Sequence, residues 1–175
     1  MKTHRFAWLA AVAWLGLLFM SGVVRAKTPG EVEAGATLRE ASMRGLNGPD
    51  RRLSQYRGKP LLINVWASWC GPCRAEMGSL ERLAWREQGL RFNTIGISTD
   101  DSEAAAKRYL QSANATLNHY IDHALELENM LGAERLPLTI LVDAKGRVLG
   151  KYYGAREWDQ ADAAKWLSST LRSEK

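Results

Sequence analysis

Residues 61–85 read LLINVWASWCGPCRAEMGSLERLAW and place two cysteines, Cys70 and Cys73, between two patterns of secondary structure. Residues 61–67 form an almost wholly apolar run, which is typical of a strand in the middle of a sheet covered by helices. The two cysteines open a run over residues 74–85 that carries apolar side chains at helical spacing and predicts a helix. Its buried face is expected to hold Met77, Leu80, Leu83 and Ala84. The only two cysteines of the chain therefore lie where a strand passes into a helix.

A cysteine at the start of a helix has a more reactive thiol than a free cysteine. The first N–H groups of a helix have no intrahelical acceptor, and the helix dipole is positive at this end. Both effects favour the thiolate, which is the nucleophile, over the thiol with its ordinary pKa of about 8.5. Cys73 follows Cys70 by about one helical turn, so the two sulfurs can close a short disulfide. The pair is expected to form a two-electron redox centre.

The first 26 residues have the features of an export signal. Two basic residues precede an apolar run over residues 6–20, and Val24-Arg25-Ala26 suits cleavage after Ala26. The alternative is an uncleaved membrane anchor, because residues 6–24 would span about 28 Å as a helix. No cysteine lies near the cleavage position, which excludes a lipoprotein. In both cases the folded part is exported, and we expect it in the periplasm.

Composition limits the remaining chain to one domain of modest charge. Loss of residues 1–26 removes three basic residues and no acid, so the net charge falls from +5 (24 − 19) to +2 (21 − 19). This balance gives no reason to expect nucleic acid or an anionic surface as a partner. Two cysteines are too few for a disulfide-stapled scaffold. We expect a flexible lead-in over residues 27–37, where turn formers dominate, and a single domain over residues 38–175.

The elements expected after the lead-in alternate between strands and helices. This alternation predicts an α/β domain with a central mixed sheet and helices on both faces. The strands are expected at residues 38–43, 51–53, 61–67, 92–98, 118–122, 138–142 and 147–153. The helices are expected at residues 74–85, 102–113, 124–131 and 158–171, and Asp100 and Glu103 suggest a capping box for the second. Asn47-Gly48-Pro49-Asp50 joins the first two strands as a hairpin.

Trp69-Cys70-Gly71-Pro72-Cys73, between a strand and a helix, resembles the motif of the thioredoxin superfamily. Residues 64–77 are similar to its exported branch, the thiol–disulfide oxidoreductases of the TlpA, ResA and DsbE type, and the resemblance extends over residues 38–171. It implies a thioredoxin-like fold with an N-terminal β-hairpin and an inserted strand and helix at residues 118–131. It also implies a cis peptide bond at Leu136-Pro137, opposite the cysteines. The substrate-binding residues that it suggests are Trp69, Gly71, Pro72, Leu136 and Pro137.

Position and resemblance suggest a role for each residue of the site. Cys70, with an exposed sulfur, is expected to attack a substrate disulfide, and the more buried Cys73 to resolve the mixed disulfide. Cytosolic thioredoxins have a buried acid where this chain has Asn64, which cannot titrate. Glu76 matches a glutamate of the exported branch and lies one turn from Cys73, so its desolvated carboxylate would accept the Cys73 proton. The alternative is a solvated glutamate without a chemical role.

Two structural uses of the cysteines are less well supported. A zinc site would need His119 and His123, but 45 residues separate Cys73 from His119, against about 12–15 in zinc fingers. A purely structural disulfide across two residues would remove little entropy from the unfolded chain. The chain also carries no dinucleotide fingerprint and no phosphate-binding loop. We therefore expect neither a metal nor a bound cofactor.

The sequence thus predicts an exported thiol–disulfide oxidoreductase that mainly reduces protein disulfides. One alternative is a dithiol oxidase for folding proteins; another is a non-catalytic binding or chaperone module that uses the same groove. Two positions depart from the family pattern: Gly78 replaces a proline that commonly kinks the helix, and Leu138 replaces a glutamate of the haem-maturation subgroup. Since no cofactor motif is present, we expect electrons from a membrane-embedded thiol donor, and a monomeric enzyme.

Overall fold

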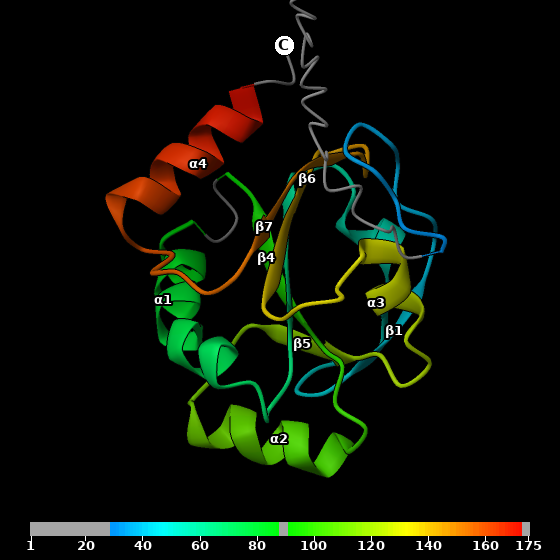
Figure 1. Cartoon of the computed structure of the whole chain (residues 1–175), viewed down its shortest axis with the longest axis vertical. Coiled ribbons are helices and arrows are strands. Elements are labelled where there is room, and N and C mark those ends of the chain that lie inside the picture. Colours follow the sequence, from blue (N-terminus) through cyan, green and yellow to red (C-terminus); the bar gives the residue numbers. More distant parts are fainter. Residues whose placement is uncertain (1–28, 88–90, 173–175) are drawn as a thin grey trace, which may run out of the picture.

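The computed structural model describes residues 29–87 and 91–172, so the expected export signal over residues 1–26 lies outside the described residues. Its strands form one sheet in the order β2-β1-β5-β4-β3-β6-β7, and helices lie on both sides of it (Figure 1). The strands are β1 Ser42–Gly45, β2 Arg51–Arg52, β3 Leu61–Trp66, β4 Asn93–Ser98, β5 Asn118–Ile121, β6 Leu138–Val142 and β7 Val148–Tyr153. The helices are α1 Gly71–Glu87, α2 Glu103–Ser112, α3 Glu126–Leu131 and α4 Ala161–Arg172, with a short 3-10 helix η1 at Leu53–Tyr56.

Strand β3 occupies the middle of the sheet, as its apolar sequence predicts. All six of its residues are buried. It pairs in parallel with β4 on one side and antiparallel with β6 on the other, so the sheet is mixed. The N-terminal hairpin and the inserted unit of β5 and α3 are both present. The predicted thioredoxin-like fold is confirmed.

Two apolar layers cover the sheet. Helices α1, α2 and α4 share one buried cluster on one face of the sheet. Helix α3 belongs to a second cluster, together with side chains of the N-terminal segment. The side chains expected to form the buried face of the helix after the cysteines are indeed buried; they are Met77, Leu80, Leu83 and Ala84. Helix α1, which carries the cysteines at its N-terminus, therefore packs against the sheet along its buried face.

Residues 29–37, within the expected lead-in, pack against the domain. Val32 is buried, and its N–H donates to the Met130 carbonyl at the end of α3. Further along, Gly35 and Ala36 exchange backbone hydrogen bonds with Val148 of β7. The expected strand at residues 38–43 is also displaced, because Leu38 bonds to Gly146 in the β6–β7 turn and β1 begins at Ser42.

Helix starts differ from the expected ones because of local hydrogen bonds. Helix α2 is capped by Ser102, whose side chain accepts from the Ala105 N–H, so the capping box of Asp100 and Glu103 was wrong. Helix α3 begins at Glu126 rather than at residue 124, since the Asp122 carboxylate accepts from the first N–H groups of the helix. Helix α4 begins at Ala161, three residues beyond the expected start at residue 158.

Candidate active site

Cys70 and Cys73 form a disulfide at the N-terminus of α1, with an S–S distance of 2.06 Å. The Cys73 N–H donates to the Cys70 sulfur at 3.2 Å. Cys73 is fully buried and Cys70 is 5% exposed, so Cys70 is the more accessible of the two, as expected, although most of the residue is covered. The reason is packing, since Cys70 belongs to the same apolar cluster as Met77, against which Leu136 also packs.

The turn between β3 and α1 is fixed by a carboxylate from the next strand connection. Asp100 accepts hydrogen bonds from the Ser68 N–H at 2.8 Å and from the Ser68 hydroxyl at 2.6 Å. The hydroxyl of Ser98 donates to the same carboxylate at 2.7 Å. These bonds anchor the residue that precedes Trp69 and so position the cysteine turn. Sequence reasoning assigned Asp100 to a helix cap and missed this role.

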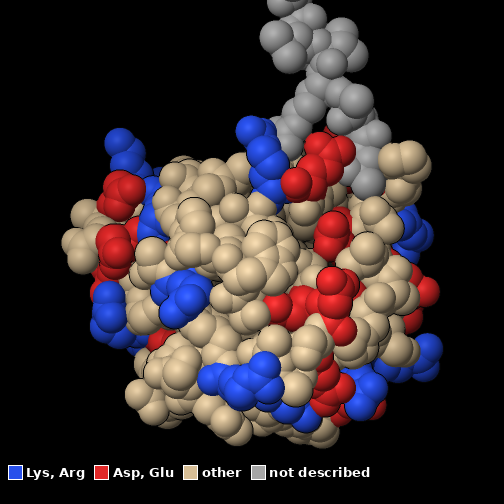
Figure 2. Space-filling view, turned by 60° about the horizontal axis from the view of Figure 1, so that its bottom comes forward, with Lys and Arg blue, Asp and Glu red and all other residues tan. Residues whose placement is uncertain are grey.

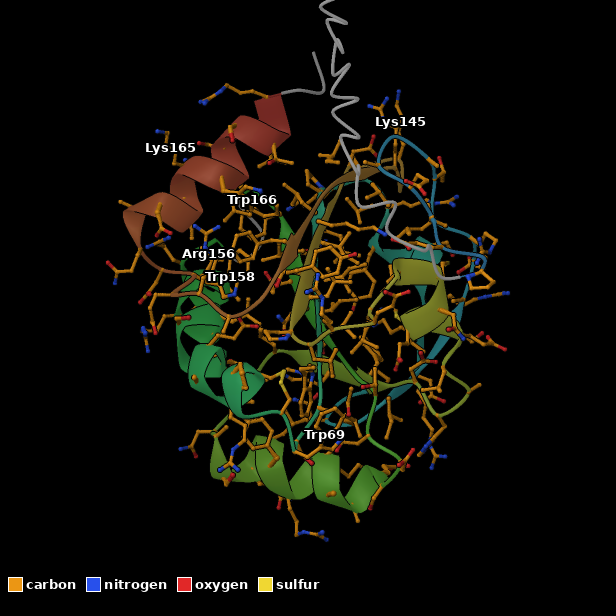
Figure 3. The ribbon with its side chains drawn as sticks, in the orientation of Figure 1. Trp69, Lys145, Arg156, Trp158, Lys165 and Trp166 are labelled. Atoms are coloured by element: carbon orange, nitrogen blue, oxygen red, sulfur yellow. A yellow bond between two sulfur atoms is a disulfide. The ribbon has the colours of Figure 1, made fainter. Side chains whose placement is uncertain are left out.

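A groove lies beside the disulfide. It has a volume of about 700 Å³ and is lined by Trp69, Cys70, Gly71, Pro72, Thr99, Asp101, Leu125, Glu128, Ala133, Glu134, Arg135 and Leu136. Trp69, which lines the groove, is 71% exposed. In Figure 3 Trp69 lies at the end of the molecule that carries α2, and Figure 2 shows acidic and basic side chains together on the face that includes this end.

The Leu136-Pro137 peptide bond is cis, as the resemblance implies. Leu136 lines the groove together with the residues of the cysteine motif, while Pro137 is not among the lining residues. The Pro137 carbonyl accepts from the Gly154 N–H at 2.9 Å, which ties the segment before β6 to the end of β7. Four of the five suggested substrate-binding residues, Trp69, Gly71, Pro72 and Leu136, are thus brought together around Cys70.

Glu76 lies on α1, three residues after Cys73, and is 1% exposed, which rules out the solvated alternative. Its Oε1 accepts from the Asn64 Nδ2 at 2.8 Å. Its Oε2 accepts from the Trp158 Nε1 at 3.0 Å and from the Arg156 backbone N–H at 3.1 Å. Burial raises the pKa of Glu76 to about 6, against the opposing effect of these hydrogen bonds. The carboxyl group can therefore exchange a proton near neutral pH.

Asn64 connects this carboxylate to the centre of the sheet. Its Nδ2 donates both to Glu76 and to the Thr139 hydroxyl of β6, at 3.0 Å. In the sequence resemblance Asn64 takes the place of the buried acid of thioredoxins. In this structure it donates a hydrogen bond to a different acid, Glu76 on α1. Sequence reasoning placed Asn64 and Glu76 in the same site but did not predict the hydrogen bond between them.

The two histidines of the zinc alternative lie in different surroundings. His119 is buried in β5, with its Nε2 3.6 Å from the Glu81 Oε1, and burial lowers its pKa. His123 is exposed. Within residues 29–87 and 91–172, no group of three or more His, Cys, Asp or Glu side chains is arranged to hold a metal ion. In these same ranges, no helix is long and apolar enough to cross a bilayer.

Comparison with known proteins places the chain among redox proteins. The family model of Redoxin matches residues 33–167. The thiol-disulfide oxidoreductase ResA of Geobacillus thermodenitrificans is 28% identical over 142 residues, covering 80% of this chain and 79% of the relative. The thiol:disulfide interchange protein DsbE of Pseudomonas fluorescens biotype C is 38% identical over 123 residues, covering 67% of each.

The same fold occurs in solved structures. A crystal structure described as a thiol:disulfide interchange protein DsbE from Chlorobium tepidum superposes with a TM-score of 0.73 at 22% identity. The match covers 81% of this chain and 99% of the other. At this level of identity the likeness concerns the fold.

Proposed function

We propose that this protein acts as an exported reductase of protein disulfides. The proposal starts from its family, because the chain belongs to the Redoxin family and is a thiol–disulfide oxidoreductase. The observation that carries the proposal is the Cys70–Cys73 disulfide at the start of α1, with a groove beside it and the buried Glu76 on the same helix. The groove gives access to a client, and Glu76 gives the inner cysteine a proton acceptor. The Gly71-Pro72 dipeptide, which resembles that of reducing thioredoxins, favours the reducing direction.

The first chemical step uses the reduced enzyme. The Cys70 thiolate attacks one sulfur of a client disulfide, a Cys70–client disulfide forms, and the other client sulfur leaves as a thiolate that takes up a proton. The N-terminal end of α1 and the Cys73 N–H, which reaches the Cys70 sulfur at 3.2 Å, stabilise the negative charge on Cys70. Cys70 is the attacking sulfur because it is the one that lines the groove.

The second step releases the client. Cys73 transfers its proton to the Glu76 carboxylate and attacks the Cys70 sulfur. The Cys70–Cys73 disulfide forms, the Cys70–client bond breaks, and the second client sulfur leaves as a thiolate that is then protonated. Two electrons pass from the enzyme to the client, and a donor must restore them. We propose that this donor is a membrane-embedded thiol protein. The enzyme would meet it in the periplasm as a monomer, and its N-terminus would be either a cleaved signal or a membrane anchor.

Trapping the mixed disulfide tests this function. Cys73→Ser removes the resolving sulfur, so the enzyme should accumulate in a covalent adduct through Cys70. Non-reducing gels of exported fractions should show bands of higher mass that collapse on reduction, and the matched variant Cys70→Ser should show none. A Cys73→Ser protein without adducts to client or donor would favour the binding-module alternative.

The reduction potential of the Cys70–Cys73 pair separates reductase from oxidase. A reductase should have a potential near that of thioredoxin, about −270 mV, whereas a strong oxidant lies near −120 mV. Equilibration of the purified protein with glutathione buffers, followed by alkylation and mass measurement, gives this potential. A value near the oxidant end would replace the reducing direction with the dithiol-oxidase alternative.

A further inference from the structure

The segment between β7 and α4 donates two hydrogen bonds to one carboxylate oxygen of Glu76, the proposed proton acceptor. Its contacts with Glu76 Oε2 are the indole N–H of Trp158 at 3.0 Å and the backbone N–H of Arg156 at 3.1 Å. Trp158 is fully buried, so its indole has one fixed orientation among its neighbours. Two donors from a segment about 80 residues away thus converge on a single carboxylate oxygen.

The Arg156 side chain brings a positive charge to the same place. Its guanidinium lies 4.4 Å from the ring centre of Tyr152 and 5.4 Å from that of Trp158, and it forms an ion pair with Asp162. The side chain is only 10% exposed. Figure 3 shows Arg156, Trp158 and Trp166 on the side of the molecule where α1 and α4 lie, apart from Trp69. The aromatic rings hold the cation near the site and away from the groove.

We propose that Trp158 and Arg156 are positioning residues, which keep the Glu76 carboxylate in one orientation and favour its ionised form. This inference rests on the proposed role of Glu76 as the acceptor of the Cys73 proton. An ionised carboxylate is the form that can accept a proton, and burial alone would oppose it. N–H donors and a nearby cation stabilise the charge, and they lower the pKa of Glu76 against the effect of burial.

Trp158 and Arg156 share this effect with Asn64 of β3. Asn64 donates to the other carboxylate oxygen of Glu76 and also lowers its pKa, but it cannot titrate. Tyr109 of α2 is the nearby titratable group on that helix, and burial, helped by the Glu76 charge, raises its pKa away from neutrality. Cys73, on the same helix as Glu76, is the proposed proton donor. Arg156 is therefore the charged side chain that acts on this carboxylate from the opposing segment.

Replacement of the indole N–H is the first test. Trp158→Phe keeps an aromatic ring but removes the donor to Glu76, and the oxidised protein can be titrated by carbon NMR of its glutamate carboxyl groups. We expect the Glu76 midpoint to rise by about one pH unit, a tenfold change in its dissociation constant. Trp166→Phe is the matched control, because Trp166 packs on Trp158 with ring centres 6.0 Å apart, whereas the indole that donates to Glu76 is that of Trp158.

A second variant keeps the inference testable if Trp158→Phe does not fold. Arg156→Gln removes the cation and leaves the backbone N–H in place, and we expect the Glu76 midpoint to rise by about half a pH unit. Asp162→Asn is its control, since it removes the partner of Arg156 but not the cation. Unchanged midpoints in both Trp158→Phe and Arg156→Gln would overturn the positioning role.

The NMR readout also separates this inference from the proposed function. A raised midpoint together with a turnover rate that does not depend on Glu76 would keep the positioning role and reject proton transfer by Glu76. An unchanged midpoint in a protein whose turnover requires Glu76 would keep the proposed function and reject the positioning role.

Discussion

Helix α1 carries two buried glutamates, Glu76 and Glu81, whose carboxyl groups have opposite acid–base behaviour. Glu76 is 1% exposed; burial raises its pKa to about 6, and the N–H groups that donate to it do not cancel this rise. Glu81 is 8% exposed; burial acts in the same direction, but its donors outweigh it and the pKa falls below its ordinary value. A buried carboxyl group can carry a proton near neutrality where burial prevails, and it is a fixed anion where its donors prevail.

The donors of Glu81 give it a structural role. Its Oε2 accepts from the Thr116 hydroxyl at 2.7 Å and the Thr116 N–H at 3.0 Å, and its Oε1 accepts from the Leu117 N–H at 3.2 Å. These bonds fasten the chain before β5 to α1. His119 lies behind them, and Gly96 leaves room for its ring, because a Cβ at residue 96 would come within 2.0 Å of the His119 Nδ1.

The largest expected effect concerns this structural carboxylate. Glu81→Ala leaves two N–H groups and a hydroxyl without an acceptor, and it should lower the free energy of unfolding of the oxidised protein by about 3 kcal/mol. The turnover rate of the folded fraction should change little. Urea unfolding and a disulfide-reduction assay measure the two quantities. A variant of normal stability with impaired turnover would mean that Glu81, and not Glu76, serves the chemistry.

The next effect is a difference in how stability depends on pH. The folded-state pKa of Glu76, about 6, exceeds its ordinary value of 4.5, so ionisation disfavours folding. The penalty is absent below pH 4.5, grows as the pH rises, and reaches about 2 kcal/mol above pH 6. Glu76→Gln should therefore gain about 2 kcal/mol relative to the wild type between pH 4.5 and 7.5, measured by urea unfolding of both oxidised proteins.

Glu81→Gln is the matched control for this pH effect. The lowered pKa of Glu81 means that its contribution to stability is present above the ordinary value of 4.5 and is lost as the pH falls through the folded-state pKa. The two variants should consequently shift stability in opposite directions with pH. Parallel shifts would show that the two carboxyl groups do not differ as described.

The smallest expected effect belongs to Asn64. Asn64→Ala removes one donor to Glu76 and one to Thr139, and it should cost about 1 kcal/mol of stability. Because Asn64 carries no proton in the reaction, the turnover rate should fall by less than about threefold, well below the range of an acid–base group. Thermal unfolding and the reduction assay give both values, and a loss of rate comparable to that of Glu76→Gln would assign Asn64 a part in the proton route.

Local patterns in the sequence were enough to predict much of the site. The strand and helix around Cys70 and Cys73 follow from the apolar pattern of residues 61–85. The cis bond before Pro137 and the burial of Glu76 agree with the family resemblance. These features depend on neighbours in the chain or on a motif that can be recognised from a few residues.

Contacts between distant segments could not be predicted in this way. Periodicity indicates that a side chain is buried but not what it meets. Trp158 was therefore expected at a helix start, whereas its indole donates to Glu76 across 82 residues. Asp100 was expected to cap α2, whereas it bonds to Ser68 across 32 residues. Trp158 and Asp100, which contact the site, thus lie in segments whose secondary structure and contacts were predicted least accurately from the sequence.

The pH–rate profile of Glu76→Gln tests the central claim most directly. The variant keeps the shape of the side chain but cannot accept the Cys73 proton. Near neutral pH its turnover should be roughly ten- to a hundredfold slower than that of the wild type, and the loss should shrink as the pH rises and hydroxide deprotonates Cys73 directly. A Glu76→Gln enzyme with the rate and pH–rate profile of the wild type would contradict the proton-transfer role of Glu76.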